Sequence, residues 1–558
     1  MAYQDMTISE LVDRIRQGEI KLPEMQRRYV WKASKVRDLL DSLYRGYPSG
    51  TILAWDADSS IETRTFAIEQ STAPRERFQL LLDGQQRLTS LSAILRGEPI
   101  SVRGRRRPID ILFNLDHPDS LVTEAEIEGD DSDADDDAIM ERLAKRTFVV
   151  SSNKIAALPN WVSVTDVFRE SGHTRFLQSA GVSSLNDSDY HRYDERLKAL
   201  KSIRDYSYRV NILSRDKSYE EVTEIFVRVN SLGAKLRSAD LALAQITAKW
   251  PGSLSIFQSY QKSCSEKGFE IDMSVLLRNL VAFATGQARF KAVAGLSREQ
   301  LEAAWPKSTA GMDFALNFAA ENLGITSTAL LSSPFLLVTL SKFGSRKDYN
   351  LDADEVANLR YWSLMANAKG RYSRGSSESL LDQDLSSISR DTGLESLLNT
   401  LRAQMGRMTI EPDDLEGKNS RSSFFKTMFL AFRQSGATDW HSGLNISLNH
   451  KGAKDSLQFH HIFPRAILKA EDLPPSEIND LANLAFIGGN TNRKLGKTAP
   501  SDYLPKLIEK RGHAMLAAQA IPEDRALWSI DSYRDFLAAR RTLIAATLGD
   551  FIGPNPMV

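Results

Sequence analysis

The segment Gln458-Phe459-His460-His461-Ile462-Phe463-Pro464 is the feature that most limits how this chain can fold. Neighbouring side chains on an extended strand point to opposite faces. On such a strand, His460 and His461 would therefore enter different surroundings. Pro464 cannot donate to a strand ladder, so the sequence predicts that it ends the strand, and that a helical stretch begins over Arg465 to Lys469.

Two asparagines downstream have a spacing that suits a strand, a turn and a helix. Asn483 and Asn492 flank the apolar stretch Leu484 to Gly489, whose final two glycines favour a tight turn before a helix. A hairpin followed by a helix would bring Asn492 back beside His460. One imidazole and one amide oxygen leave positions for waters and a phosphate oxygen, which favours Mg²⁺ or Mn²⁺ over structural zinc.

These residue types predict the hydrolysis of a phosphodiester. His461 is the candidate general base, because an imidazole with a pKa of about 6.5 can take a proton from water at neutral pH. His460 and Asn492 would hold one divalent metal, which would stabilise the leaving oxygen. We group Asn483 with the catalytic residues because its amide would fix the loop that carries the base, and we expect Lys494 to contact a DNA phosphate.

This pattern resembles the HNH nuclease motif, a ββα-metal fold, in the version found in GmrSD-type restriction enzymes. Residues Thr498 to Leu504 also resemble the ending of that family, and the likeness covers roughly Thr400 to Leu548. The resemblance implies the same four roles. Asn490 and Asn492 both remain candidates for the last metal ligand, and the spacing from Asn483 favours Asn492. An isolated histidine pair without these asparagines would more often be a structural pair at a helix start.

A second motif, Asp83-Gly84-Gln85-Gln86-Arg87, follows a predicted strand over Phe78 to Leu82 and opens a predicted helix. Backbone N–H groups at a helix start can bind phosphate, and Gly84 lets a ligand approach closely. Arg87 could form a two-point contact with phosphate. A structural pair of Asp83 and Arg87 at a strand–helix corner explains the same residues equally well.

A third cluster, just upstream, combines hydrogen-bond donors with aromatic rings. Gln26, Arg27 and Tyr29 could stack on bases and bind phosphate. Alternatively, Tyr29 and Trp31 anchor a helix that the apolar spacing predicts over Trp31 to Tyr44.

The front of the chain also resembles a known domain. Both upstream clusters, with a further block from Glu224 to Leu236, look like the N-terminal domain of the GmrSD-type family, which is related to the ParB and sulfiredoxin fold. The resemblance implies that the Asp83 to Arg87 motif binds and hydrolyses a nucleotide, with GTP favoured. In phosphorothioate-sensing members it implies that the region of Gln26, Arg27 and Tyr29 senses the DNA modification. Within the further block, a nucleotide or DNA contact and a simple capped turn are equally consistent.

Composition limits the class of protein. At 558 residues the chain is too long for one core, and its hydrophobic fraction of 42% is ordinary for a soluble protein. The single cysteine, Cys264, excludes internal disulfides and fits a reducing cytosol. We find no apolar run that could span a bilayer and no signal peptide. The net charge of −1 shows no chain-wide basic excess, although an acidic stretch (Glu124 to Asp137) and a basic cluster (Arg103 to Arg107) mark local asymmetry.

The sequence therefore predicts a multidomain α+β protein. We expect a ParB/sulfiredoxin-like α/β domain over residues 1–245, a helical connecting domain over 246–400, and a mostly helical HNH domain over 401–558. The expected function is an NTP-regulated, metal-dependent endonuclease or nickase, cytoplasmic, acting on modified double-stranded DNA in restriction or phage defence. The alternatives are a non-catalytic ParB-like regulator and an NTPase with an inactive nuclease domain. The sequence does not decide whether the protein forms a homo-oligomer.

Overall fold

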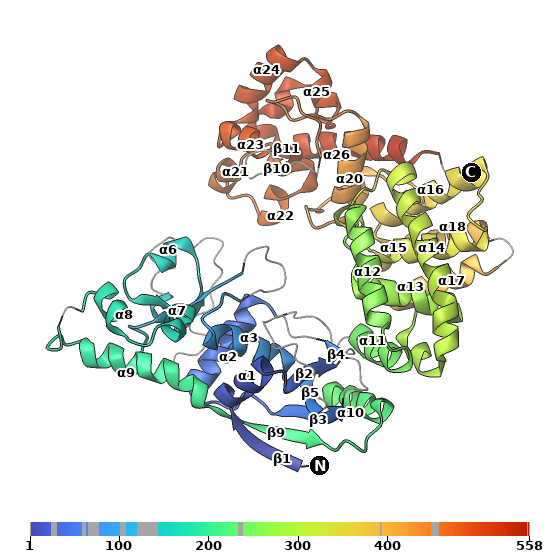
Figure 1. Cartoon of the computed structure of the whole chain (residues 1–558). Helices are drawn as coiled ribbons and strands as arrows, with labels where there is room; N and C mark the ends of the chain where they lie inside the picture. Colours follow the sequence, from blue (N-terminus) through green and yellow to red (C-terminus); the bar gives the residue numbers. More distant parts are fainter. Residues whose placement is uncertain are drawn as a thin grey trace. The chain divides into compact units, whose positions relative to one another are not determined.

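The structure is a computed structural model with two compact units, residues 1–254 and residues 255–558. It describes residues 2–23, 31–58, 63–64, 77–100, 108–119, 143–182, 184–232, 238–390, 393–447, 457–554 and 556. The protein is a multidomain α+β molecule whose strands lie mostly in the first unit (Figure 1). Within the described ranges, no helix is long and apolar enough to cross a membrane.

The first unit is built on a mixed six-stranded sheet in the order β1-β9-β3-β5-β2-β4. Its strands are β1 (Ala2–Thr7), β2 (Ile20–Pro23), β3 (Ile52–Asp58), β4 (Thr63–Arg64), β5 (Arg77–Asp83) and β9 (Ser207–Leu213). A second, three-stranded sheet has β6 (Ile111–Asn114) between β7 (Phe148–Val150) and β8 (Trp161–Ser163). The helices of this unit are α1 (Ile8–Arg16), α2 (Ala33–Tyr44), α3 (Gln85–Leu95), α6 (Asn153–Ala156), α7 (Val164–Arg169), α8 (Thr174–Ser179), α9 (Tyr190–Lys201), α10 (Tyr219–Leu232) and α11 (Ser238–Lys249).

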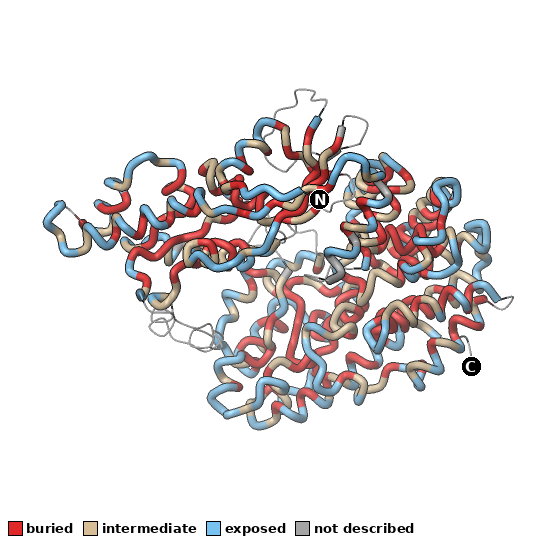
Figure 2. The backbone as a smooth tube through the Cα atoms, turned by 90° about the horizontal axis from the view of Figure 1, so that it is seen from below, coloured by how far each residue is buried: buried red, intermediate tan, exposed pale blue. Residues whose placement is uncertain are grey.

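The large sheet is buried on both faces. Side chains alternate along a strand, so Leu81 of β5 packs into a cluster with α1, α2 and α3, while Leu80 and Leu82 pack into another cluster with α10. Burial on both faces explains why the centre of β5 is a continuous apolar run rather than an alternating one. The central strands β3 and β5 are mostly buried, whereas the edge strand β1 is mostly exposed. Figure 2 shows how buried and exposed segments alternate along the backbone.

The local predictions for the first unit hold. The expected helix after Trp31 is α2, and its apolar positions, spaced by three and four residues, are all buried. The expected strand over Phe78 to Leu82 is β5, and the helix after Gly84 is α3. Periodicity alone was therefore sufficient to place these elements.

The second unit is mostly helical, as the sequence predicts for residues 246–406. Its helices are α12 (Ser253–Glu266), which begins at the boundary, α13 (Met273–Thr285), α14 (Arg298–Leu323), α15 (Phe335–Arg346), α16 (Ala353–Ala368), α17 (Ser377–Ile388), α18 (Gly393–Met405), α19 (Pro412–Leu415), α20 (Ser423–Gln434), α21 (Arg465–Ala470), α22 (Pro475–Ile478), α23 (Gly489–Leu495), α24 (Pro500–Arg511), α25 (Ala514–Ala517) and α26 (Tyr533–Ile552). Its two strands are β10 (Leu457–His461) and β11 (Leu484–Gly488).

One continuous hydrophobic core runs through this unit. The cluster extends from Cys264 to Ile552 and includes Trp362 of α16, Phe432 of α20 and Phe486 of β11. Arg360 also ties α16 to the end of α26, because its guanidinium donates to the backbone oxygens of residues 551 and 552 at 2.7 and 2.9 Å. The middle helices and the C-terminal segment therefore pack around shared side chains, and their division into two domains near residue 400 stays a prediction.

The short β10–β11 sheet lies among these helices (Figure 1). The strands are antiparallel, with His460 opposite Ala485 and His461 opposite Leu484. Pro464 was expected to end the first strand, but β10 ends earlier, at His461, and Pro464 is the N-cap of α21. The Ile462 N–H still donates to the backbone oxygen of Asn483 at 2.8 Å in the same register, and the Phe463 N–H then donates to the Asn483 side chain at 2.8 Å.

Several sequence predictions lie outside the described residues. They are Gln26, Arg27 and Tyr29, the basic cluster at 103–107 and the acidic stretch at 124–137. The last part of the block from Glu224 to Leu236 lies outside them as well.

Candidate functional site

The structure brings His460 and Asn492 together. Nδ1 of His460 lies 2.8 Å from Oδ1 of Asn492, although the two residues are far apart in the sequence. The Asn492 amide nitrogen donates to Oε1 of Gln458 at 2.9 Å, which turns the amide oxygen toward the imidazole. β11 leads directly into α23, so the short strand–helix connection at Gly488-Gly489 returns Asn492 to β10.

The His460 imidazole is buried and uncharged. Only 3% of the residue is exposed, and burial lowers its pKa to about 4, although the Asn492 contact acts in the opposite direction. Its Nε2 has no hydrogen-bond partner among the described residues. The ring packs edge-on against the rings of Trp440 and Tyr503, with centroids 6.0 and 5.9 Å away. At neutral pH this ring is therefore a neutral imidazole, the form that can bind a metal.

The separation of the two facing atoms suits a small divalent cation. Two atoms bound to one Mg²⁺ at neighbouring octahedral positions lie about 3 Å apart, close to the 2.8 Å between His460 and Asn492. Within the described ranges, no group of three or more His, Cys, Asp or Glu residues could hold a metal. A cation here would therefore have one imidazole and one amide from the described chain, and its other positions would be left to water and substrate. In the observed contact the Asn492 amide oxygen can only accept, so Nδ1 carries the imidazole proton here, and metal binding at Nδ1 would require that proton to move to Nε2.

His461 lies on the opposite face of β10 and is half-buried. Its Nε2 lies 3.1 Å from Oδ1 of Asn479. The Asn479 amide nitrogen donates to the backbone oxygen of Pro475 at 2.9 Å, so the amide oxygen is the atom that faces the ring. An oxygen acceptor assigns the proton to Nε2 and leaves Nδ1 as the basic nitrogen. Burial lowers the pKa of His461, so the ring is a free base at neutral pH.

Asn483 is fully buried and holds the loop around the histidine strand. Its Oδ1 accepts the Phe463 N–H at 2.8 Å, and its amide nitrogen donates to the backbone oxygens of Phe463 and Ile478, both at 3.1 Å. All of these partners are backbone groups within the protein. The geometry therefore gives Asn483 a positioning role for the chain that follows His461, as its amide was expected to have.

Asp439 was not found by sequence reasoning, yet it anchors the start of α23. Its carboxylate accepts the Gly488 N–H at 2.7 Å and the Thr491 hydroxyl at 2.8 Å. Burial alone would raise its pKa, but hydrogen bonds from Ser442, Gly488 and Thr491 hold the pKa below its usual value. An isolated aspartate carried no pattern that could have revealed this role. Asn479, which orients His461, was missed for the same reason.

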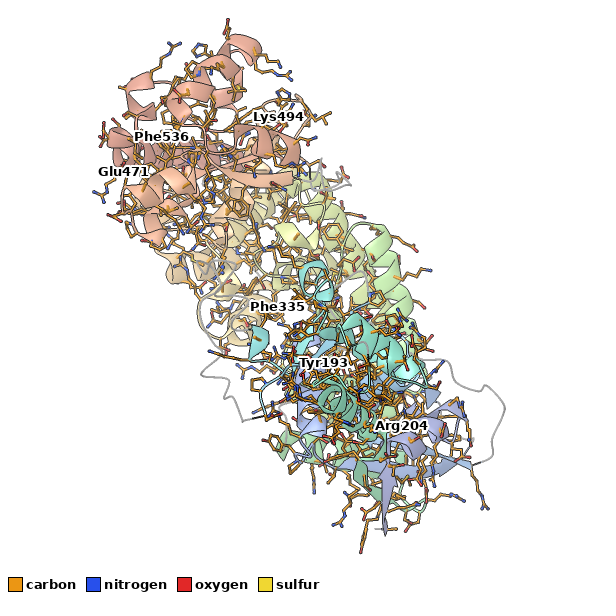
Figure 3. The ribbon with its side chains drawn as sticks, turned by 90° about the vertical axis from the view of Figure 1, so that its left-hand side faces the viewer. Tyr193, Arg204, Phe335, Glu471, Lys494 and Phe536 are labelled. Atoms are coloured by element: carbon orange, nitrogen blue, oxygen red, sulfur yellow. The ribbon has the colours of Figure 1, made fainter. Side chains whose placement is uncertain are left out.

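The neighbouring polar residues separate into two groups. Asn490 is exposed and its amide oxygen accepts from Arg493 at 2.9 Å, so it does not face His460. Lys494 is exposed at the edge of the second unit (Figure 3), and its amine lies 2.5 Å from Nε2 of His441. The Lys494 charge lowers the pKa of His441. Arg511 donates to the His441 backbone oxygen, which gathers further positive charge here.

In the first unit, the guanidinium of Arg87 forms hydrogen bonds with groups of the protein itself. Its guanidinium donates to the backbone oxygens of Ser49 and Thr51, each at 2.6 Å, and to the Asp83 carboxylate at 3.2 Å. The same guanidinium lies over the Tyr208 ring, 5.5 Å from its centroid. These bonds fix the loop between α2 and β3 against the start of α3. The observed contacts are those of a structural pair of Asp83 and Arg87 at a strand–helix corner.

The rest of the motif lies at the start of α3. Gly84 adopts φ +96°, a left-handed conformation that favours glycine, and it is the N-cap residue of the helix. Gln85 is buried, and Oε1 of Gln86 accepts the Trp31 N–H at 3.2 Å. The Asp83 side chain is 41% exposed and is the most accessible charged group here. In the block from Glu224 to Leu236, Arg228 bonds to Glu224 at 2.7 Å, one helical turn earlier on α10.

Comparison with known proteins assigns the first unit. Residues 8–247 match the family model described as the GmrSD restriction endonuclease, N-terminal domain. The first unit is therefore similar to the N-terminal domain of GmrSD-type restriction endonucleases.

The chain is also similar to Uncharacterized protein MJ0686 of Methanocaldococcus jannaschii. The two are 23% identical over 561 aligned positions, which cover 91% of this chain and 88% of the relative. This similarity extends across both units.

Proposed function

We propose that this protein is a metal-dependent DNA endonuclease or nickase of the HNH type, regulated by a nucleotide and used in restriction or anti-phage defence. The similarity of residues 8–247 to the N-terminal domain of GmrSD-type restriction endonucleases supports the substrate class and the defence role. The observation that carries the proposal is that the two histidines of β10 have different partners. His460 faces Asn492, and His461 faces Asn479.

The chain's own residues account for the proton transfer. His461 would take a proton from the attacking water on Nδ1, because Nε2 is occupied by the contact with Asn479. A lowered pKa keeps this ring unprotonated and ready at neutral pH. Asn479 would hold the tautomer and ring orientation during the step, much as carboxylates and amides orient histidines in other enzymes.

His460 and Asn492 are the residues that would hold Mg²⁺ or Mn²⁺. When bound, the cation would neutralise the phosphate charge and stabilise the leaving oxygen. Asp439 would keep this arrangement in place, because it fixes the backbone at Gly488 and the hydroxyl of Thr491 beside the ligand. Lys494 would attract the anionic DNA backbone.

The nucleotide function of the first unit rests on the family. The Asp83 to Arg87 motif would form part of a site for an NTP, with GTP favoured. Since Arg87 is bonded to backbone oxygens, the exposed carboxylate of Asp83 and the N–H groups at the start of α3 are the groups that remain to meet a ligand. We further propose that this unit has a ParB-like fold. Modified double-stranded DNA would be sensed by Gln26, Arg27 and Tyr29.

The nuclease assignment is tested by nicking of plasmid DNA with Mg²⁺ present. His461→Ala should slow cleavage by roughly 10²–10⁴-fold, the usual loss when a general base is removed. His513→Ala is the matched control, because His513 is an exposed imidazole that lies 2.9 Å from Glu523. Comparing matched modified and unmodified substrates with each NTP tests the regulatory part. Cleavage by His461→Ala at the control rate would refute the assignment of the base.

A further inference from the structure

A cavity of about 420 Å³ in the second unit has a strongly basic lining. Five cationic side chains contribute to it, and none of its lining residues is acidic. The cations are Lys369, Arg374, Lys418, Arg421 and Lys426. In a chain with 71 basic and 72 acidic residues, a lining of one sign of charge is a local concentration of positive potential. We call this cavity the basic pocket.

Three of the five cations have no carboxylate partner among the described residues: Arg374, Lys418 and Arg421 are exposed and make no ion pair there. The other two are held in place, since Lys369 lies 3.4 Å from Asp414 and Lys426 donates to the Leu331 backbone oxygen at 2.6 Å. The pocket therefore combines two fixed cations with three whose charges are available to an anion from solution.

The backbone adds donors to the same place. Helix α20 begins at the pocket, and its N-cap Ser422 and first residues Ser423 and Phe424 are part of the lining. The positive end of the helix dipole and the free N–H groups of a first turn both favour an anion. The Ser422 hydroxyl accepts the Phe424 N–H at 3.2 Å and the Ser422 backbone oxygen accepts the Phe425 N–H at 3.2 Å, which leaves the Ser423 N–H of this turn for a ligand.

The chemistry of the lining indicates a phosphodiester rather than a free nucleotide. The pocket offers cations, hydroxyls and the amide of Asn419, and its one aromatic residue, Phe424, is buried. Such a lining can contact phosphate oxygens but has no exposed ring on which a base could stack. Phosphate contacts of this kind position a nucleic acid without reading its sequence.

A second cavity lies beside the basic pocket and is lined in part by the histidine strand. It has a volume of about 280 Å³, and Lys426 lines both cavities. Its other lining residues include Gln458, which accepts from the Asn492 amide, and Phe459, whose side chain is 45% exposed. An exposed ring between a phosphate site and a cleavage site is suited to stack on a base or sugar of the same strand.

From these contacts we infer that the basic pocket binds a backbone phosphate of the DNA that the His461 site cleaves. The inference rests on the proposed nuclease function, since it names how that site holds its substrate. It adds a second point of attachment on the same unit, reached along the surface that carries Phe459 and Gln458.

The test measures duplex DNA binding by the full-length protein in a His461→Ala background, by fluorescence anisotropy over a series of salt concentrations with Mg²⁺. The pocket variant carries Arg374→Ala, Lys418→Ala and Arg421→Ala. The control variant removes three exposed lysines outside the pocket and carries Lys262→Ala, Lys291→Ala and Lys307→Ala. Equal thermal unfolding midpoints would establish that both variants are folded.

The pocket variant should bind DNA about 10-fold or more weakly than the control variant, equally for different sequences. The slope of log affinity against log salt should also fall by about 1, as expected for one lost phosphate contact. Equal DNA affinity of the two variants overturns the inference. So does loss of GTP or inorganic phosphate binding with unchanged DNA binding, because the pocket would then be a nucleotide or free-phosphate site.

The experiments distinguish a failure of the proposed nuclease function from a failure of the inference about the basic pocket. If His461→Ala cleaves DNA at the wild-type rate, the proposed nuclease site is wrong whatever the pocket does. If cleavage requires His461 but the pocket and control variants bind DNA alike, only the pocket inference is wrong.

Discussion

Nδ1 of His460 and Oδ1 of Asn492 face one another at 2.8 Å across the junction of β10 and α23. Asn490, two residues earlier on the same helix, instead accepts from Arg493. A helix turns by about 100° per residue, so residues two apart lie on different faces. The structure thus distinguishes the two asparagines that the sequence left as alternatives.

Replacing each asparagine separately tests this distinction. Asn492→Ala should reduce Mg²⁺-dependent cleavage by about 100-fold or more, since even groups outside the ligand set typically cost 10–100-fold. Asn490→Ala should leave the rate nearly unchanged. The measurement is the cleavage rate as a function of Mg²⁺ concentration. A larger loss in Asn490→Ala than in Asn492→Ala would reverse the assignment of the ligand.

The pH dependence of cleavage should reflect the lowered pKa of His461. Burial favours the neutral ring, so the base form persists below the ordinary imidazole pKa of about 6.5. Activity should be level near neutral pH and decline only as the pH falls through the lowered pKa, where the ring becomes protonated. The acidic limb of kcat/KM reports this value for the free enzyme. A midpoint at or above 6.5 would contradict a buried base.

Asn483→Ala should destabilise the second unit. The change leaves the Phe463 N–H and two backbone oxygens without their partner inside the protein, and each such buried group costs about 1–3 kcal/mol. We expect a loss of about 3 kcal/mol or more in the free energy of unfolding, measured with urea. Asn490→Ala, at an exposed position, serves as the control. Lost cleavage with unchanged stability would instead indicate that Asn483 acts directly on the reaction.

Asp83 and Arg87 allow the nucleotide role to be separated from the fold. Arg87→Ala removes two charged hydrogen bonds to backbone oxygens and should cost about 3 kcal/mol or more of stability in the first unit. Asp83→Asn should cost less than about 1 kcal/mol, because this carboxylate is exposed and its ion pair is a surface pair. NTP hydrolysis lost in a folded Asp83→Asn variant would support the site. Hydrolysis at the wild-type rate would argue that Asp83 is not part of it.

The sequence was sufficient for features that depend on neighbours in the chain. The repeating apolar positions of α2 and the continuous apolar run in β5 have their pattern because one face or both faces are buried, so periodicity locates them. The alternation of side chains on a strand likewise separates His460 from His461 without any knowledge of tertiary contacts. Glycine pairs and prolines mark turns for equally local reasons. Pro464 does not end the strand, however, because β10 ends at His461 and the Phe463 N–H already donates to the side chain of Asn483.

Contacts between distant segments were beyond the sequence. Asp439 and Asn479 have no local pattern, yet one anchors α23 and the other fixes the ring of His461. Arg87 has the chemistry of a phosphate ligand, and only the position of the Ser49–Thr51 loop shows that its donors are already used. The five cations of the basic pocket come from two segments, residues 369–374 and 418–426, and only the tertiary structure brings these segments together.

Residue types and their spacing in the sequence thus determined which residues of this protein can act as a base or a metal ligand and which can form turns. Tertiary structure decided which of them meet, which nitrogen of His461 stays basic and which asparagine faces His460. The physical reason is that hydrogen bonding and burial depend on distances between segments. Those distances are set by packing of the whole core and not by spacing along the chain.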